Sequence, residues 1–132
     1  MEQPDSWTRI ETSDFVSLGT FRKTGVVVET PVWIARDGDD LVVTTERATG
    51  KVKRLRRNPE VTLQPCSRMG AIQEGSEKVT GRARLVQGDE TADAALAAKY
   101  GFQFRAILGA ERFVRRLQRR EGQRVIIRIA RA

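Results

Sequence analysis

Five residues in the stretch TGKVKR have the types and spacing that bind a phosphate or another anion: Thr49, Gly50, Lys51, Lys53 and Arg54. Thr49 suits the N-cap of a helix, and Val52 and Leu55 lie three residues apart on one face of that helix. The N-terminus of a helix presents free backbone N–H groups and the positive end of the helix dipole. The stretch therefore predicts an anion site at a helix start, with a solvated basic helix face as the alternative.

A second stretch, VVVETPVWIARDG, is apolar enough for a β-strand, yet Pro31 lies at its centre. Proline has no backbone N–H and cannot donate to the hydrogen-bond ladder of a sheet. Within sheets it is therefore confined to edge strands, strand starts and bulges. A strand with this composition needs a structural reason for its proline.

No catalytic signature accompanies these two stretches. The sequence has no Gly-rich dinucleotide loop, no Walker motif, no nucleophile elbow and no Cys or His ligand pair. It has no histidine, which excludes a histidine base, and its single cysteine argues against a zinc site. That residue, Cys66, is interpreted as a small buried hydrophobe, because no base is available to it. We expect no metal, and any chemistry must come from a bound group.

Strands and short helices alternate along the chain and must position the two stretches. Strands are expected at residues 14–23, 26–37, 41–45, 60–66, 78–86 and 123–132, and helices at 50–57, 90–100 and 102–120. The last helix combines an apolar stripe with arginines that crowd residues 112–120. A small antiparallel barrel would bury such strands without leaving open edges.

Length and composition fit one domain at residues 14–132 after a polar lead-in at residues 1–13. No apolar run is long enough to span a bilayer, and the acidic, polar N-terminus does not resemble a secretory signal. The lone cysteine suits a reducing cytoplasm. The net charge of +7 suggests an anionic partner, although a generally charged surface would give the same total.

The segment TFRKTGVVVETPVWIARDGDDLVVTTERATGKVKRLRRNPEVTLQPC resembles the FMN-binding split-barrel superfamily, named for pyridoxamine 5'-phosphate oxidase. The shared features are an early hairpin with a TPVW-type second strand, a short strand, a basic helix and an RRNP-V exit into the next strand. The resemblance is closest over roughly residues 14–66. Within the superfamily the chain looks most like the flavin/deazaflavin oxidoreductases, and among them the branch that uses coenzyme F420.

The resemblance implies a mostly β fold with short helices, an antiparallel, Greek-key-like split β-barrel that forms a homodimer with two cofactor sites at the interface. The isoalloxazine-like ring would lie near Thr30, Pro31, Val32 and Trp33. The phosphate would lie near Thr49, Gly50 and Lys51, with Lys53 and Arg54 close by. Residues 66–77 and the last strand would approach the partner's site. Members rely largely on backbone contacts to the ring, so the lack of a catalytic side chain is no departure.

Pro31 gains a plausible role within such a barrel. A residue without an N–H interrupts the ladder and can bulge the strand. Backbone groups around Thr30, Val32 and Trp33 could then face a planar ring instead of a neighbouring strand. We therefore predict that Pro31 lies at the lip of the cofactor site and is not buried in continuous sheet.

The implied activity is hydride transfer between the deazaflavin C5 and an unsaturated or otherwise activated small organic substrate. Coenzyme F420 carries an oligoglutamate tail, which needs a basic groove. Basic residues for that groove are Arg22, Lys23, Arg56, Arg57 and the arginines of 112–120. FMN, with one terminal phosphate, would need fewer and is the second choice of cofactor.

Other interpretations remain open at this point. The +7 charge also fits a nucleic-acid-binding β-barrel, but aromatic residues make up only 6% of the chain, few for a base-stacking surface. A cofactor carrier without turnover is a third possibility. Trp33 and Tyr100 could each serve the site or simply pack in the core, and no motif marks the substrate pocket.

Overall fold

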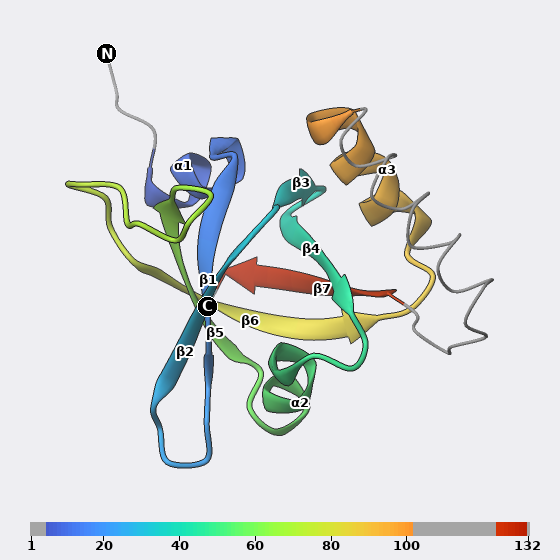
Figure 1. The fold of residues 1–132 in the computed structure, drawn as a ribbon. Coiled ribbons are helices and arrows are strands. Elements are labelled where there is room, and N and C mark those ends of the chain that lie inside the picture. Colours follow the sequence, from blue (N-terminus) through green and yellow to red (C-terminus); the bar gives the residue numbers. More distant parts are fainter. Residues whose placement is uncertain (1–4, 102–123, 132) are drawn as a thin grey trace.

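The computed structural model describes residues 5–101 and 124–131, which form seven strands and three helices (Figure 1). The strands are β1 Phe15–Phe21, β2 Val27–Val32, β3 Ala35–Asp37, β4 Asp40–Glu46, β5 Glu60–Cys66, β6 Val79–Val86 and β7 Arg124–Arg131. The helices are α1 Ser6–Thr12, α2 Gly50–Arg57 and α3 Glu90–Tyr100. Across these two ranges, every helix is too short or too polar to cross a lipid bilayer.

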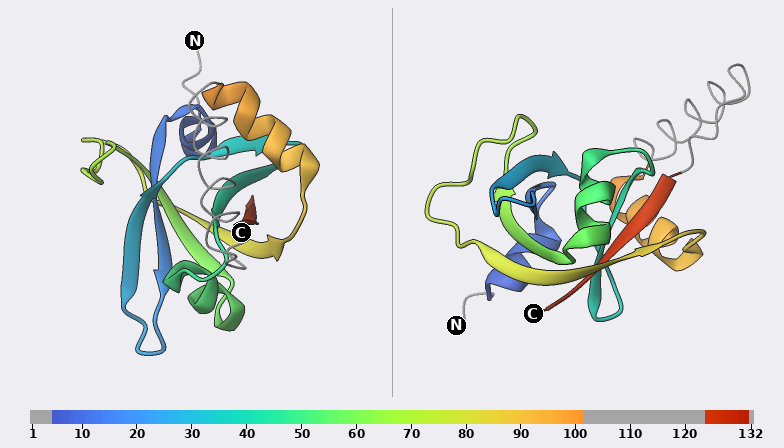
Figure 2. Two further views of the ribbon diagram at one scale, coloured as in Figure 1. Left: turned by 45° about the vertical axis from the view of Figure 1, so that its right-hand side comes forward. Right: turned by 90° about the horizontal axis from the view of Figure 1, so that it is seen from below.

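The strands form one antiparallel sheet in the order β2-β1-β5-β6-β7-β4-β3. The sheet curls around an apolar interior, as two further views show (Figure 2). Its end strands, β2 and β3, are consecutive in the chain and are joined through Trp33 and Ile34. This arrangement confirms the predicted mostly β, split-barrel architecture.

Side chains fill the interior of the barrel. Successive strand residues point to opposite faces, and Val16 and Leu18 of β1 point inward and are fully buried. Leu63 of β5 and Ile127 of β7 join the same cluster. α2 lies against β1 and β6. Because the interior is occupied, a ligand has to bind at the rim of the barrel or on its outside.

The end of α3 binds the link between β2 and β3 and the segment that leads into β1. The Lys99 ammonium donates to the carbonyl oxygens of Glu11, Ser13 and Ile34 at 2.8, 2.6 and 2.6 Å. The Tyr100 hydroxyl accepts from the Ile34 N–H at 2.9 Å. Burial raises the pKa of Tyr100 to about 12, so the hydroxyl keeps its proton at neutral pH. The last two residues of α3 thereby form hydrogen bonds with backbone groups of the link and of the segment before β1.

Arg128 of β7 forms ion pairs with the β3–β4 turn and with the start of α3. Its guanidinium pairs with Asp37, with Asp40 at 3.1 Å and with Asp89 at 3.1 Å. Hydrogen bonds from Arg128 lower the pKa of both Asp37 and Asp89. Asp89 is also the N-cap of α3, where its side chain accepts from the Ala92 N–H. Arg128 therefore anchors the start of α3 to the sheet.

Within the described residues the predicted order of elements is present, with two differences. Residues 26–37 form two strands, because the chain passes from one end of the sheet to the other at Trp33 and Ile34. The polar segment before residue 14 contains α1, capped by Asp5, whose Trp7 and Ile10 are buried in the main core. The predicted helix at 102–120, with its arginines 112–120, lies outside the described residues.

Candidate functional site

α2 begins and ends where the sequence predicted, between an N-cap at Thr49 and a C-cap at Asn58. Val52 and Leu55 are buried, and the first turn has no acidic residue. An N-cap hydroxyl normally accepts from a backbone N–H of the first turn. The Thr49 hydroxyl makes no such bond, although its oxygen is buried and has no other partner. The hydrogen-bonding capacity of this hydroxyl at the helix start is therefore unused among the described residues.

Arg54 lies back across the first turn of the same helix. Its Nε donates to the Thr20 hydroxyl of β1 at 2.6 Å. A Cβ on residue 50 would lie 2.7 Å from Nη1 of Arg54, closer than side chains tolerate. Gly50 thus leaves the space that the guanidinium occupies. Within the described residues, the Nη groups of Arg54 have no acceptor, so they are free to bind an anion.

Further positive charges surround Arg54. Burial and the charges of Arg22 and Arg57 lower the pKa of Arg54. Burial and the charges of Arg54 and Arg124 lower the pKa of Lys51. Four of these side chains have no carboxylate partner in the part of the chain that is described: Arg22, Lys51, Arg54 and Arg57. Mutual repulsion makes this cluster costly, and a bound anion would relieve it.

Three of the four predicted ring-binding residues, Thr30, Pro31 and Val32, lie on β2 and alternate in direction. Thr30 is half-buried, and its hydroxyl oxygen is buried without a hydrogen-bond partner. Val32 belongs to the barrel core and is 8% exposed. Pro31 is exposed, on a strand that forms one end of the described sheet. A Cβ on Gly70 would lie 3.9 Å from Cδ of Pro31, so the 67–77 loop approaches the proline.

Pairing of β2 with β1 continues through Pro31, which lies opposite Ser17, and the expected bulge is absent. The proline is tolerated because β2 is an end strand of the described sheet and has no second neighbour there to receive an N–H. The expectation that Pro31 would interrupt the ladder is therefore wrong. Its exposure at an open strand edge agrees with a position beside a ligand site.

Trp33 points to the other side of the β2–β3 link. Its indole stacks on the Tyr100 ring, with centroids 4.7 Å apart and planes inclined by 10°. Both side chains pack against a second core cluster beneath α3, which includes Leu96. The backbone of Trp33 directly follows β2, which carries Pro31, whereas its side chain packs against Tyr100.

Strand register relates the two halves of the site. Thr20, the partner of Arg54, lies opposite Val28 of β2. Pro31 is three residues further along β2, or about 10 Å at the rise of an extended strand. Lys53 is exposed on the outer side of α2. A molecule with an anionic end at α2 and a planar end at Pro31 would have to bridge that separation.

Two residues at the site were missed by the sequence analysis. Thr20 occupies an inward position of β1 after Val16 and Leu18, and a polar residue in that alternation was a usable signal. Arg124 begins β7 and donates to the Thr44 hydroxyl at 3.0 Å. Nothing in the local sequence links Arg124 to Lys51, because their proximity depends on the fold.

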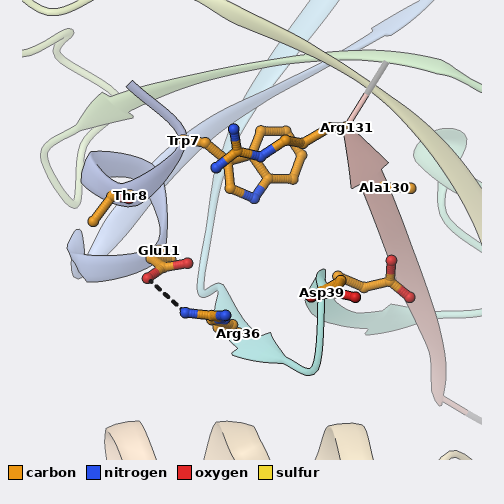
Figure 3. A pocket seen from close by; sticks show the side chains of 8 residues that line it. Trp7, Thr8, Glu11, Arg36, Asp39, Ala130 and Arg131 are labelled. Carbon is orange, nitrogen blue, oxygen red and sulfur yellow. Dashed lines mark ion pairs between the residues drawn. The ribbon is translucent and has the colours of Figure 1, made fainter. Parts of the chain in front are cut away.

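A separate cavity of about 430 Å³ lies between α1, the β3–β4 turn and the end of β7 (Figure 3). Arg131 lies over the indole of Trp7 at 5.2 Å, and Arg36 pairs with Glu11 at 3.6 Å. None of the predicted site residues lines this cavity. Most of its charged groups already have partners within the protein, unlike the cluster at α2.

The residues at α2 and β2 fit a cofactor that carries a phosphate. Arg54, Lys51 and the free N–H groups of the first turn offer donors and positive charge to the anion. The Thr49 hydroxyl at the helix start lacks a partner and can donate to an anion. The Thr30 hydroxyl lies on the same face of β2 as the core residue Val32, so only the backbone of Thr30 faces the open edge. The exposed edge at Pro31 leaves backbone accessible to a planar ring.

The fold is shared with solved structures of low sequence identity. An F420 reductase is 17% identical over 98% of this chain and 96% of its own, with a TM-score of 0.61. The heme storage protein HutZ from Vibrio cholerae is 14% identical over 100% and 92%, with a TM-score of 0.65. General Stress Protein 26 from Bacillus anthracis is 21% identical over 93% and 83%, with a TM-score of 0.58. At these identities the likeness shows the fold alone.

Family membership follows from a sequence model that spans nearly all of the described fold. No curated protein matches the chain in sequence. The family model described as Pyridoxamine 5'-phosphate oxidase matches residues 7–131, from the first turn of α1 to the end of β7. The chain therefore belongs to the pyridoxamine 5'-phosphate oxidase family.

Proposed function

We propose that this protein is an oxidoreductase that binds coenzyme F420 at the α2–β2 site. The observation that carries the proposal is a group of cations along α2 and at the end of β1, Arg22, Lys51, Arg54 and Arg57, which have no carboxylate partner among the described residues. One phosphate would use Arg54, Lys51 and the first turn of α2. Arg22 and Arg57 then remain for further negative charge, which F420 carries in its oligoglutamate tail and FMN lacks.

The chain's own residues bind and orient the cofactor. Arg54 and Lys51 hold the phosphate, and the Thr49 hydroxyl donates to one of its oxygens. The edge of β2 at Thr30 and Pro31 flanks the ring, and Tyr100 fixes that edge by bonding the Ile34 N–H. When bound, reduced F420 supplies a hydride from C5 of the deazaflavin. The substrate is a small organic molecule with an activated double bond or a similar acceptor.

We further propose that the protein acts as a homodimer. Met69 and Ile72 in the loop beside Pro31 are 89% and 44% exposed, and exposed apolar side chains that gather in one loop mark a candidate contact surface. A second copy that covers this loop would shield the ring edge of the site from water. The partner chain would then supply the rest of the substrate pocket.

Competition between cofactors tests the proposal. The protein is incubated with F420, FMN or an equimolar mixture, and the bound fraction is separated and identified by its visible spectrum. We expect F420 in the bound fraction from the mixture. FMN in its place would assign the site to a flavin oxidoreductase, and an empty bound fraction in all three samples would refute both cofactors at this site.

A further inference from the structure

Thr20 is a buried polar residue where the barrel pattern calls for an apolar one. It follows Val16 and Leu18 on the inward face of β1, and like them it has no exposed surface. A buried hydroxyl is costly unless it is hydrogen-bonded. Its partner is Arg54, whose Nε donates to the Thr20 oxygen at 2.6 Å from the neighbouring helix.

This one bond fixes the direction of the Arg54 side chain. Arg22, Arg57 and Lys51 all carry the same charge, so repulsion favours a swing of Arg54 into solvent. The bond to Thr20 holds the guanidinium instead against Gly50, at the start of α2. It uses only Nε–H, and the Nη groups stay free in a fixed orientation.

We propose that Thr20 is the positioning residue of the anion site. Its hydroxyl holds Arg54 across the first turn of α2 before any ligand binds. The side chain of Arg54 has then already lost its conformational entropy, so ligand binding does not carry that cost. Thr20 lies at the barrel end and contacts the ligand only through Arg54. The inference rests on the proposed function, since it concerns the same site.

The test compares Thr20→Val, which keeps the shape and removes the hydroxyl, with Thr20→Ser, which keeps the hydroxyl. Dissociation constants are measured by fluorescence for F420 and for the same deazaflavin without its phosphate. We expect Thr20→Val to bind F420 about tenfold more weakly, or about 1.4 kcal/mol. Its affinity for the phosphate-free compound should equal that of the wild type, and Thr20→Ser should restore F420 binding.

An equal loss for both ligands would make Thr20 merely structural, and no loss for either would remove it from the site. Arg54→Lys provides a second route that leaves the barrel interior untouched. Lysine keeps the charge but lacks the guanidinium and its Nε–H, so Arg54→Lys should weaken F420 binding. Adding Thr20→Val to Arg54→Lys should cause no further loss of affinity. Additive losses in the double variant would contradict the inference.

Inorganic pyrophosphate separates this inference from the proposed function. Added pyrophosphate should raise the melting temperature of the wild type and of Thr20→Ser by a large amount, and that of Thr20→Val by a small amount. That order without cofactor binding would support the positioning role and refute the proposed function. Equal stabilisation of all three proteins, or none of the wild type, would overturn the positioning role.

Discussion

Tyr100 stacks on Trp33 and, through its hydroxyl, accepts a hydrogen bond from the backbone N–H of the next residue, Ile34. The ring of Tyr100 and its hydroxyl thus both contact the two-residue link between the end strands of the sheet. Because β2 carries the proposed ring edge immediately before this link, the end of α3 supports the candidate site without entering it.

Replacement of Tyr100 by Phe keeps the stack but removes the hydroxyl. The Ile34 N–H is then left without its acceptor in a half-buried place, which costs about 1–3 kcal/mol. We expect the midpoint of urea unfolding to fall accordingly, while circular dichroism of the folded protein stays the same. A midpoint equal to that of the wild type would show that water replaces the hydroxyl and that the link needs no clamp.

Acid should weaken the anchor at Arg128. The pKa values of Asp37 and Asp89 are lowered in the folded protein from the ordinary aspartate value of 3.8, chiefly by hydrogen bonds from Arg128. Their contribution to stability is therefore complete above about pH 4 and is lost as the pH falls below that value, because the unfolded chain binds protons more readily.

Urea unfolding at a series of pH values from 7 to 3 measures this loss. Arg128→Met should be less stable than the wild type at pH 7, and the difference should shrink towards pH 3. Asp39→Asn, at an exposed residue of the same turn, should follow the wild type throughout. A constant difference across the series would mean that the carboxylates do not depend on Arg128.

Gly50→Ala should separate binding from stability. Alanine favours a helix over glycine by up to about 1 kcal/mol, which offsets the loss of the Arg54–Thr20 bond, so the free energy of unfolding should change little. The new Cβ would meet Nη1 of Arg54 at 2.7 Å and push the guanidinium away from the helix start. We expect roughly tenfold weaker binding of F420, about the strength of one charge-assisted hydrogen bond. Unchanged binding would contradict a fixed position of the Arg54 guanidinium over Gly50.

The sequence predicted α2 well because its signals are local. Thr49, the pair Val52 and Leu55, and the Asn58-Pro59 stop all lie within one short stretch. α1 was missed because its apolar side consists of only Trp7 and Ile10 in an otherwise polar segment. Those two residues become core only when β3 and β5 pack against the helix.

Long-range contacts at the site could not be predicted. The bond from Arg54 to Thr20 joins residues 34 apart in sequence, and its existence depends on how α2 lies against the barrel. The direction of the Trp33 side chain is likewise decided by Tyr100, 67 positions further on, through the stack beneath α3. The apolar character of β2 was visible in the sequence, but which neighbour each face would meet was not.

Met69→Glu tests the proposed homodimer. The wild type should elute with twice the chain mass of 14.8 kDa when its mass is measured by light scattering. A charge at this exposed apolar position should shift the population to single chains at low micromolar concentration. Glu74→Gln, an exposed change in the same loop, should leave the mass as it is. A wild type with the mass of one chain would refute the dimer.

Titration of the wild-type protein with F420, followed by the fluorescence of the deazaflavin, tests the central claim most directly. We predict saturation at one F420 per chain with micromolar affinity, and an affinity that falls steeply with added salt because the cluster at α2 is cationic. Arg54→Gln should abolish saturation in the same range. A fluorescence signal that does not saturate at micromolar protein, or one that Arg54→Gln leaves unaltered, would contradict the proposed cofactor site.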